Sequence, residues 1–178
     1  KKLIECVPNF SEGNDMHIID QITAEIKAVE GVSLIDVDPG KATNRTVVTM
    51  VGTPEEVCEA AFRAVKKASE LIDMKKHKGA HPRFGATDVC PLVPVSNITM
   101  EETVEYARAL AKRIGEELNI PVYCYESAAF VPERKNLATC RAGEYEALGE
   151  RLSSEQWHPD FGPRELNEWT AKTGATAV

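Results

Sequence analysis

A short basic segment is the part of the sequence best suited to chemistry. It places four cations and two histidines within nine residues and has no acidic side chain: Lys75, Lys76, His77, Lys78, His81 and Arg83. The whole chain, in contrast, carries a formal net charge of −7. Because an acidic protein repels anions, an anionic ligand must bind at a local cluster of positive charge. We therefore expect such a ligand to bind here.

His81 is the candidate for acid–base catalysis in this segment. An imidazole titrates near neutral pH, and neighbouring cations favour its neutral form, which can accept a proton. The alternative is a structural histidine that hydrogen-bonds to the backbone. His77 lies between two lysines, and we expect it to be solvated. The residue types alone leave both interpretations of His81 open.

The spacing of His77 and His81 also raises the question of a metal site. Histidines four residues apart on a helix can share a zinc ion. Gly79 and Pro82 argue against a regular helix here, and the surrounding cations oppose a dication. We therefore predict no metal.

The composition narrows the class of protein. The 178 residues suit one compact domain, and 43% hydrophobic and 28% charged residues are typical of a soluble globular protein. No apolar run approaches the ~20 residues that span a bilayer, and no signal peptide pattern opens the chain. An acidic surface repels nucleic acid and anionic membranes, so we expect neither as a partner.

The cysteines indicate structural thiols. They are odd in number and widely spread, without a CxxC pair: Cys6, Cys58, Cys90, Cys124 and Cys140. A disulfide framework is not indicated. Buried, reduced thiols and a cytoplasmic protein are the simpler interpretation.

Hydrophobic periodicity then gives the elements that must position these residues. We expect strands at 2–7, 32–38, 45–51, 88–95 and 122–125, and helices at 15–30, from 53, from 99 and at 144–152. Thr53 and Thr99 each stand three residues before a glutamate, which predicts a capping box at two helix starts. The element order is β-α-β-β-α-β-α-β-α.

This order predicts an α+β fold of the split βαβ, or ferredoxin-like, type. We expect a two-layer sandwich in which a mixed sheet of about five or six strands carries the helices on one face, because each long helix has one apolar stripe. The other sheet face then needs a partner or a ligand. Residues 1–152 form the expected core, and residues 153–178 form an aromatic, proline-rich tail that we expect to wrap over it.

Several segments together resemble the formiminotransferase family. They are residues 5–13, 43–46, 77–91, 141–146 and 159–163, which occur in the family's order and with family-like spacing over nearly the whole chain. One departure is Leu92, where the family often has phenylalanine; it concerns packing more than chemistry.

The resemblance implies transfer of a formimino group between 5-formiminotetrahydrofolate and L-glutamate, in histidine degradation. It places His81 on the family's catalytic histidine and Asp38 near it, to orient the imidazole or to hold the amine. Asp38 in the sequence Asp-Pro-Gly is equally a plain turn residue. No metal cofactor is implied.

The same resemblance suggests where the two substrates bind. Both carry carboxylates, which Arg83, Lys78 and Arg45 are suited to pair with. Part of the folate site is implied at Phe161, Gly162, Pro163 and Arg164. The alternatives are that these cations are solvated and that the aromatic residues only pin the tail to the core.

The family's complete unit has two subdomains with folate between them, and this chain matches the first. The resemblance therefore implies a C-terminal subdomain as partner, with the fragment inactive alone, and a tendency to form homo-oligomers. The competing hypotheses are a non-catalytic folate-binding or regulatory module and an interaction domain.

Overall fold

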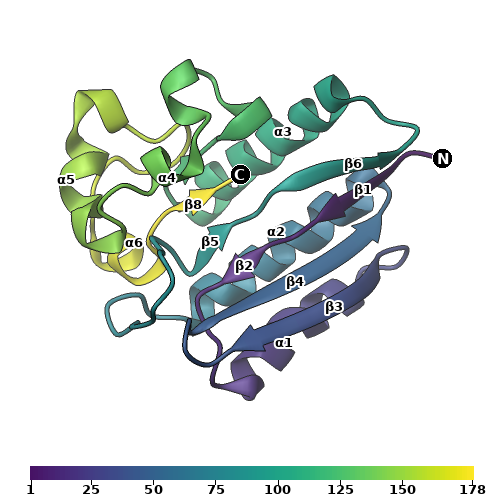
Figure 1. Cartoon of the computed structure of the whole chain (residues 1–178), viewed down its shortest axis with the longest axis horizontal. Helices are drawn as coiled ribbons and strands as arrows, with labels where there is room; N and C mark the ends of the chain where they lie inside the picture. Colours follow the sequence, from purple (N-terminus) through teal and green to yellow (C-terminus); the bar gives the residue numbers. More distant parts are fainter.

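The computed structural model describes residues 1–178 and has an α+β fold of two layers (Figure 1). The strands are β1 Leu3–Cys6, β2 Asn9–Phe10, β3 Ser33–Gly40, β4 Arg45–Gly52, β5 Thr87–Val89, β6 Leu92–Ser96, β7 Val122–Tyr123 and β8 Thr176–Ala177. The α-helices are α1 Met16–Lys27, α2 Pro54–Leu71, α3 Met100–Leu118, α4 Leu137–Cys140, α5 Leu148–Ser153 and α6 Glu168–Thr173. Short 3-10 turns are η1 Glu126–Ala128, η2 Pro132–Arg134, η3 Tyr145–Ala147 and η4 Glu155–Trp157.

All eight strands belong to one mixed sheet, in the order β6-β1-β4-β2-β5-β8-β7 with β3 paired to β4. The strand count exceeds the expected five or six partly because the run expected at 88–95 is divided. Pro91 separates β5 from β6, and Pro8 likewise separates β1 from β2. Proline lacks the N–H that a central ladder needs, so the chain bends at each of these prolines and a separate strand follows it; β2, beyond Pro8, lies outside the expected strand at 2–7.

Three long helices cover one face of the sheet, as expected. Figure 1 shows α1 and α2 behind β3, β4 and β1, with α3 beside β6. Ile22, Ile26 and Val57 are buried in this layer. Since burying an aliphatic side chain contributes about 1.5–3 kcal/mol, such stripes fix the orientation of the helices. No helix is both long and apolar enough to cross a membrane.

The two predicted capping boxes differ in outcome. At α3 the Thr99 hydroxyl accepts from the Glu102 amide and the Glu102 carboxylate accepts from the Thr99 amide, so this box is confirmed. At α2 the prediction is wrong, because the Thr53 side chain makes no capping hydrogen bond. Pro54 at the first turn still suits the helix start, since proline has no backbone N–H that would need a hydrogen-bond acceptor there.

The opposite sheet face is covered only in part. A second apolar cluster joins Phe84, Val89 and Tyr123 to Leu148 and Leu152 of α5. Cys90 and Val122, the immediate neighbours of Val89 and Tyr123 along the chain, belong instead to the main core cluster, which also contains Ile22, Ile26 and Val57 under the helices. Since successive strand residues point to opposite faces, the two clusters lie on opposite sides of the sheet.

The rest of that face, over β3, β4, β1 and β6, has no covering helix (Figure 1). Ile35, Val93 and Val95 keep 60%, 42% and 53% of their surface exposed. Ile35 lies on β3 and the two valines lie on β6, with β4 and β1 between them. Large apolar side chains at such exposures on both sides of these strands indicate a surface that another layer can cover. We name this region, from Ile35 to Val95 across the four strands, the open face.

Residues 153–178 do more than wrap the domain. Trp169 donates from Nε1 to the Leu118 carbonyl, 2.8 Å away, and both tryptophans are half-buried. Beyond α6 the chain enters the sheet as β8, between β5 and β7 and parallel to both. The expected single helix at 144–152 is instead η3 followed by α5, preceded by the unpredicted α4.

Gly85 provides a test of how the end of the chain is packed. A Cβ at Gly85 would lie 1.7 Å from the Ala175 carbonyl oxygen, whereas a Cβ at Gly149 in α5 would lie 3.6 Å from the Leu166 side chain, an ordinary van der Waals contact. We expect Gly85→Ala to lower the free energy of unfolding by about 1–3 kcal/mol or more, because the backbones must separate. The control Gly149→Ala should stabilise the chain by up to ~1 kcal/mol, since alanine favours helix. Urea unfolding of both variants measures these changes. An unchanged free energy of unfolding in Gly85→Ala would contradict the close approach of Gly85 to Ala175.

Candidate functional site

The loop that connects α2 to β5 carries the basic segment and is held by the turn between β3 and β4. Asn44 Nδ2 donates to the Lys78 carbonyl oxygen at 2.9 Å, and its Oδ1 accepts from the Gly13 amide at 2.9 Å. The Ala80 amide donates to the Ala42 carbonyl. A Cβ at Gly79 would lie 2.3 Å from the Thr43 carbonyl oxygen, so only glycine allows this approach. The turn thus fixes the loop beside the first residue of β4.

His81 is half-buried where this loop lies beside the turn between β3 and β4, and it contacts Arg45, the first residue of β4. Arg45 Nη1 lies 2.5 Å from His81 Nε2, and His81 Nδ1 lies 2.5 Å from the Pro82 carbonyl oxygen. A guanidinium can only donate and a carbonyl can only accept. Nε2 therefore carries the lone pair and Nδ1 carries the proton, so the ring is a neutral imidazole with its basic nitrogen toward Arg45.

The surroundings of His81 favour this neutral form. Burial lowers the pKa of His81 below its usual value, and the positive charge of Arg45 lowers it further. The hydrogen bond to Pro82 and the carboxylate of Asp88 act in the opposite direction. The proton-accepting form therefore persists at pH values below those at which an ordinary histidine becomes protonated.

Replacing Arg45 tests this electrostatic effect. Arg45→Gln keeps an N–H donor near Nε2 but removes the charge, so we expect the pKa of His81 to rise. Arg45→Lys keeps the charge and should leave the pKa lowered. NMR titration of the His81 ring measures both. An unchanged pKa in Arg45→Gln would contradict an effect of the guanidinium.

A buried ion pair that the sequence interpretation missed lies next to His81. Asp88, only 1% exposed, pairs with Nη1 of Arg141, and its other oxygen accepts from the Phe84 amide at 2.7 Å. Burial raises the pKa of the Asp88 carboxyl, and the guanidinium opposes this rise. Both residues fall within the family-like segments, but 53 residues separate them and no periodicity links them.

Arg83 is occupied by other contacts within the chain. It pairs with the Glu146 carboxylate through Nη1 and Nη2, each at 2.9 Å, and Nη1 also reaches Glu144 Oε1 at 3.2 Å. Its Nε donates to His77 Nδ1 at 3.3 Å. The expectation of a solvated His77 is wrong, because this ring is 9% exposed and its Nε2 donates to the Asn44 carbonyl oxygen. Arg83 and His77 thus join the loop to its neighbours.

Lys78 and Asp38 are both exposed. The Lys78 ammonium makes no hydrogen bond or ion pair within the chain, which leaves it free to meet an anion. Asp38 pairs in register with Val47, and Gly40 pairs with Arg45, so Asp38 and Arg45 are diagonal neighbours on one sheet face. Asp38 makes no hydrogen bond to His81, whose Nδ1 is bound to Pro82 instead.

The predicted folate segment lies in a different part of the fold. Phe161 pairs with Val122, and a Cβ at Gly115 of α3 would lie 2.6 Å from the Phe161 Cβ. Gly162 has a positive φ of 89° and lies against the Ile120 carbonyl. Pro163 is half-buried and Arg164 is exposed. No hydrogen bond or ion pair connects residues 161–164 with the His81 loop, so the two groups of predicted residues are not brought together by this chain alone.

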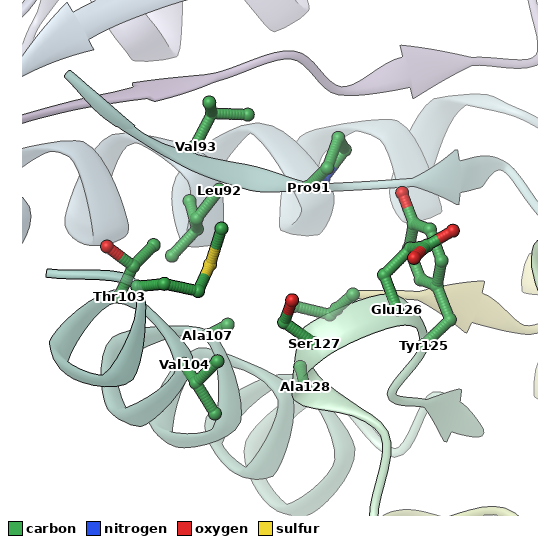
Figure 2. A pocket seen from close by; sticks show the side chains of 12 residues that line it. Pro91, Leu92, Val93, Thr103, Val104, Ala107, Tyr125, Glu126, Ser127 and Ala128 are labelled. Carbon is green, nitrogen blue, oxygen red and sulfur yellow. The ribbon is translucent and has the colours of Figure 1, made fainter. Parts of the chain in front are cut away.

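Other features of the molecule offer no second reactive centre. No group of three or more histidine, cysteine or acidic side chains is placed to hold a metal ion. All five cysteines are free, and burial raises the pKa of Cys58 and Cys124 to about 12, which keeps them protonated. An apolar hollow of about 280 Å³ lies between β6, α3 and η1. Figure 2 shows Leu92 reaching toward Val104 and Ala107, with Ser127 beside them, and none of the predicted site residues lines it.

Comparison with known proteins gives consistent matches. The family model described as the formiminotransferase domain, N-terminal subdomain, matches residues 3–178. The chain is 55% identical over 176 residues to formimidoyltransferase-cyclodeaminase of Mus musculus, covering 98% of this chain and 32% of that protein. It is 49% identical over 177 residues to glutamate formimidoyltransferase of Streptococcus pyogenes serotype M1, covering 99% and 58%. A glutamate formimidoyltransferase of Thermoplasma acidophilum is 46% identical, with 99% and 57% covered. The chain thus spans about a third to just over half of these relatives.

Proposed function

We propose, from the premise that this chain belongs to the formiminotransferase domain family as an N-terminal subdomain, that it is half of a glutamate formimidoyltransferase. The reaction is transfer of the formimino group between 5-formiminotetrahydrofolate and L-glutamate, the step of histidine degradation implied by the resemblance. The observation that carries this proposal is His81, a neutral imidazole whose basic Nε2 is directed at Arg45, at the edge of the open face. The names of the Streptococcus and Thermoplasma relatives support the reaction class.

His81 would move the proton that the transfer requires. As the glutamate amine forms its bond to the formimino carbon, the attacking nitrogen gives a proton to Nε2. The imidazolium then gives that proton to N5 of tetrahydrofolate as the bond between N5 and the carbon breaks. The same path run backward describes the reverse transfer. General base catalysis of this kind contributes about 10²–10⁴-fold.

Arg45 would act as a carboxylate ligand that also controls access to the base. In the free chain its guanidinium occupies the lone pair of Nε2, 2.5 Å away. A substrate carboxylate offers the guanidinium a stronger, charge-assisted partner. Pairing with it would release Nε2 for the amine, so that the base is freed as the substrate binds. Lys78, which has no partner within the chain, would hold a second carboxylate.

Asp38 and Arg83 have different support. Asp38 is exposed, and it pairs with Val47, two residues from Arg45 on the neighbouring strand. This position suits a residue that holds the substrate amine better than one that orients the imidazole. Arg83 would bind substrate only if it left the Glu146 carboxylate, so we propose that it anchors the loop. The folate role of residues 161–164 is supported by the family resemblance alone, and it stays part of the proposal on that basis.

A C-terminal subdomain would complete the site by covering the open face. The support is the exposure of Ile35, Val93 and Val95 together with the greater length of the relatives. Self-association through the same face is the alternative. The test is calorimetric titration of the chain with tetrahydrofolate, alone and with a C-terminal subdomain present. We expect tighter binding with the subdomain, and equal binding in both cases would contradict a shared site.

A further inference from the structure

The carbonyl oxygen of Pro82 is shared by His81 and Arg141. His81 Nδ1 donates to it across 2.5 Å, and Arg141 Nη1 donates to it across 3.3 Å. The tautomer of His81 depends on this carbonyl, because it is the acceptor that keeps the proton on Nδ1. Whatever directs the Pro82 carbonyl therefore also directs the His81 ring.

Asp88 fixes the same short stretch of backbone from the other side. Its Oδ1 accepts the Phe84 amide at 2.7 Å, while its Oδ2 pairs with Arg141. The ring of Pro82 already fixes its φ, so ψ is the dihedral that decides where its carbonyl points. Arg141 restrains that carbonyl directly, and Asp88 restrains the chain two residues further on.

The burial of this pair makes it a rigid support. The side chains of Asp88 and Arg141 are 1% and 14% exposed. Removing one partner of such a pair leaves an uncompensated buried charge, which typically costs about 3–5 kcal/mol. Asp88 and Arg141 are thus held together strongly, although neither contacts the basic nitrogen of His81.

We propose that Asp88 and Arg141 are positioning residues, which hold the Pro82 carbonyl against His81 Nδ1 and so keep Nε2 as the free base. The hydrogen-bonding effect is a property of the chain alone, and only its catalytic consequence rests on the proposed function. Neither residue needs to contact substrate.

The variant that tests this proposal is Asp88→Asn with Arg141→Met, which removes both charges and leaves neither buried alone. Asparagine keeps an oxygen for the Phe84 amide, and methionine keeps much of the arginine stem. The measurement is the Nδ1 proton of His81 by NMR, above the pKa of the ring, where a hydrogen-bonded proton exchanges slowly with water. Arg45 still donates to Nε2 in the variant, so the change is measured at Nδ1.

A matched control exists in the same chain. Asp160 and Arg134 form a second buried pair, 11% and 9% exposed, at 3.0 Å. There too the aspartate accepts a backbone amide, from Cys124, and the arginine donates to a carbonyl, that of His158. Asp160→Asn with Arg134→Met removes the same groups without touching the His81 loop.

We expect the Nδ1 proton of His81 to exchange faster in the Asp88/Arg141 variant, by about tenfold or more, and to be unchanged in the Asp160/Arg134 control. Equal exchange in the wild type and the Asp88/Arg141 variant would overturn the proposal. If that variant does not fold, Asp88→Asn with Arg141→Gln serves, because it also leaves neither charge buried alone. A smaller increase is then expected, and an unchanged rate would again contradict the proposal.

Kinetics of the assembled transferase separate this proposal from the proposed function. Misplacing the base should lower kcat by roughly 10²-fold with little change in KM. A wild-type assembly without transferase activity would contradict the proposed function, while the exchange measurement would still decide the positioning role. Unchanged kcat in an active assembly would overturn the catalytic consequence of the pair.

Discussion

Replacing His81 by glutamine in the assembled transferase is expected to slow formimino transfer by about 10²–10⁴-fold, the usual contribution of a positioned general base. Glutamine keeps polar contacts with Arg45 and Pro82 but cannot carry the proton between the amine and N5. Single-turnover transfer, measured in quenched samples as the conversion of 5-formiminotetrahydrofolate to tetrahydrofolate, isolates this step from product release.

The control for this variant is His17→Gln, an exposed histidine in α1. It should keep wild-type turnover, because α1 packs on the other sheet face. His81→Gln should also keep the circular dichroism spectrum and unfolding transition of the wild type. Turnover within twofold of the wild type in His81→Gln would remove His81 from the mechanism.

The isolated chain is expected to transfer formimino groups at least about 10²-fold more slowly than a complete enzyme built around it. The reason is positional, since holding two reactants in the correct geometry provides much of the rate of such reactions. A suitable complete enzyme is the Streptococcus pyogenes relative with its matching 177 residues replaced by this chain, to which they are 49% identical.

Two comparisons make this experiment decisive. The remainder of the Streptococcus protein alone should be inactive, because it lacks His81. The chimera carrying His81→Gln should also be inactive. An isolated chain as fast as the chimera would mean that the site is complete without a second subdomain. A folded chimera that binds folate without turnover would favour the non-catalytic module.

Much of the architecture follows from local patterns. The apolar stripes of α1, α2 and α3 and the β-branched runs of β3 and β4 each favour one structure, and neighbouring elements agree with it. The helix layer on one sheet face could therefore be predicted. The strand at 2–7 was located correctly, and the short β2 beyond Pro8 was missed. The strand at 88–95 was located but not divided, since its bend depends on how Pro91 fits into a ladder.

The short elements after residue 125 could not be predicted in the same way. In this part of the chain, side-chain contacts between separate segments hold the backbone in place, and the sequence shows no hydrophobic periodicity that would reveal them. Arg134 binds Asp160 and the carbonyls of Gln156 and His158, and Arg151 donates to three backbone carbonyls between 139 and 142. The two-residue strand β8 carries too little pattern to be recognised, yet it lies inside the sheet.

The candidate site was predictable in composition but not in contacts. The basic segment and His81 were evident from residue type, and the structure adds the pairing of Nε2 with Arg45. Arg83 was expected to pair with a substrate carboxylate or to be solvated, but Glu144 and Glu146 bind it from 61 and 63 residues away. Such partners are not visible in a local window, which is also why Asp88 and Arg141 were missed.

The central claim is that the protonation of His81 controls the reaction, and the pH dependence of kcat/KM in the assembled enzyme tests it most directly. The pKa of His81 is lowered, so kcat/KM should stay high below the ordinary histidine value of about 6.5 and fall as the pH drops through the lowered pKa. We expect the midpoint of that fall to match the midpoint of the His81 NMR titration in the same enzyme. Midpoints that differ, or a kcat/KM that does not fall as His81 becomes protonated, would contradict the mechanism.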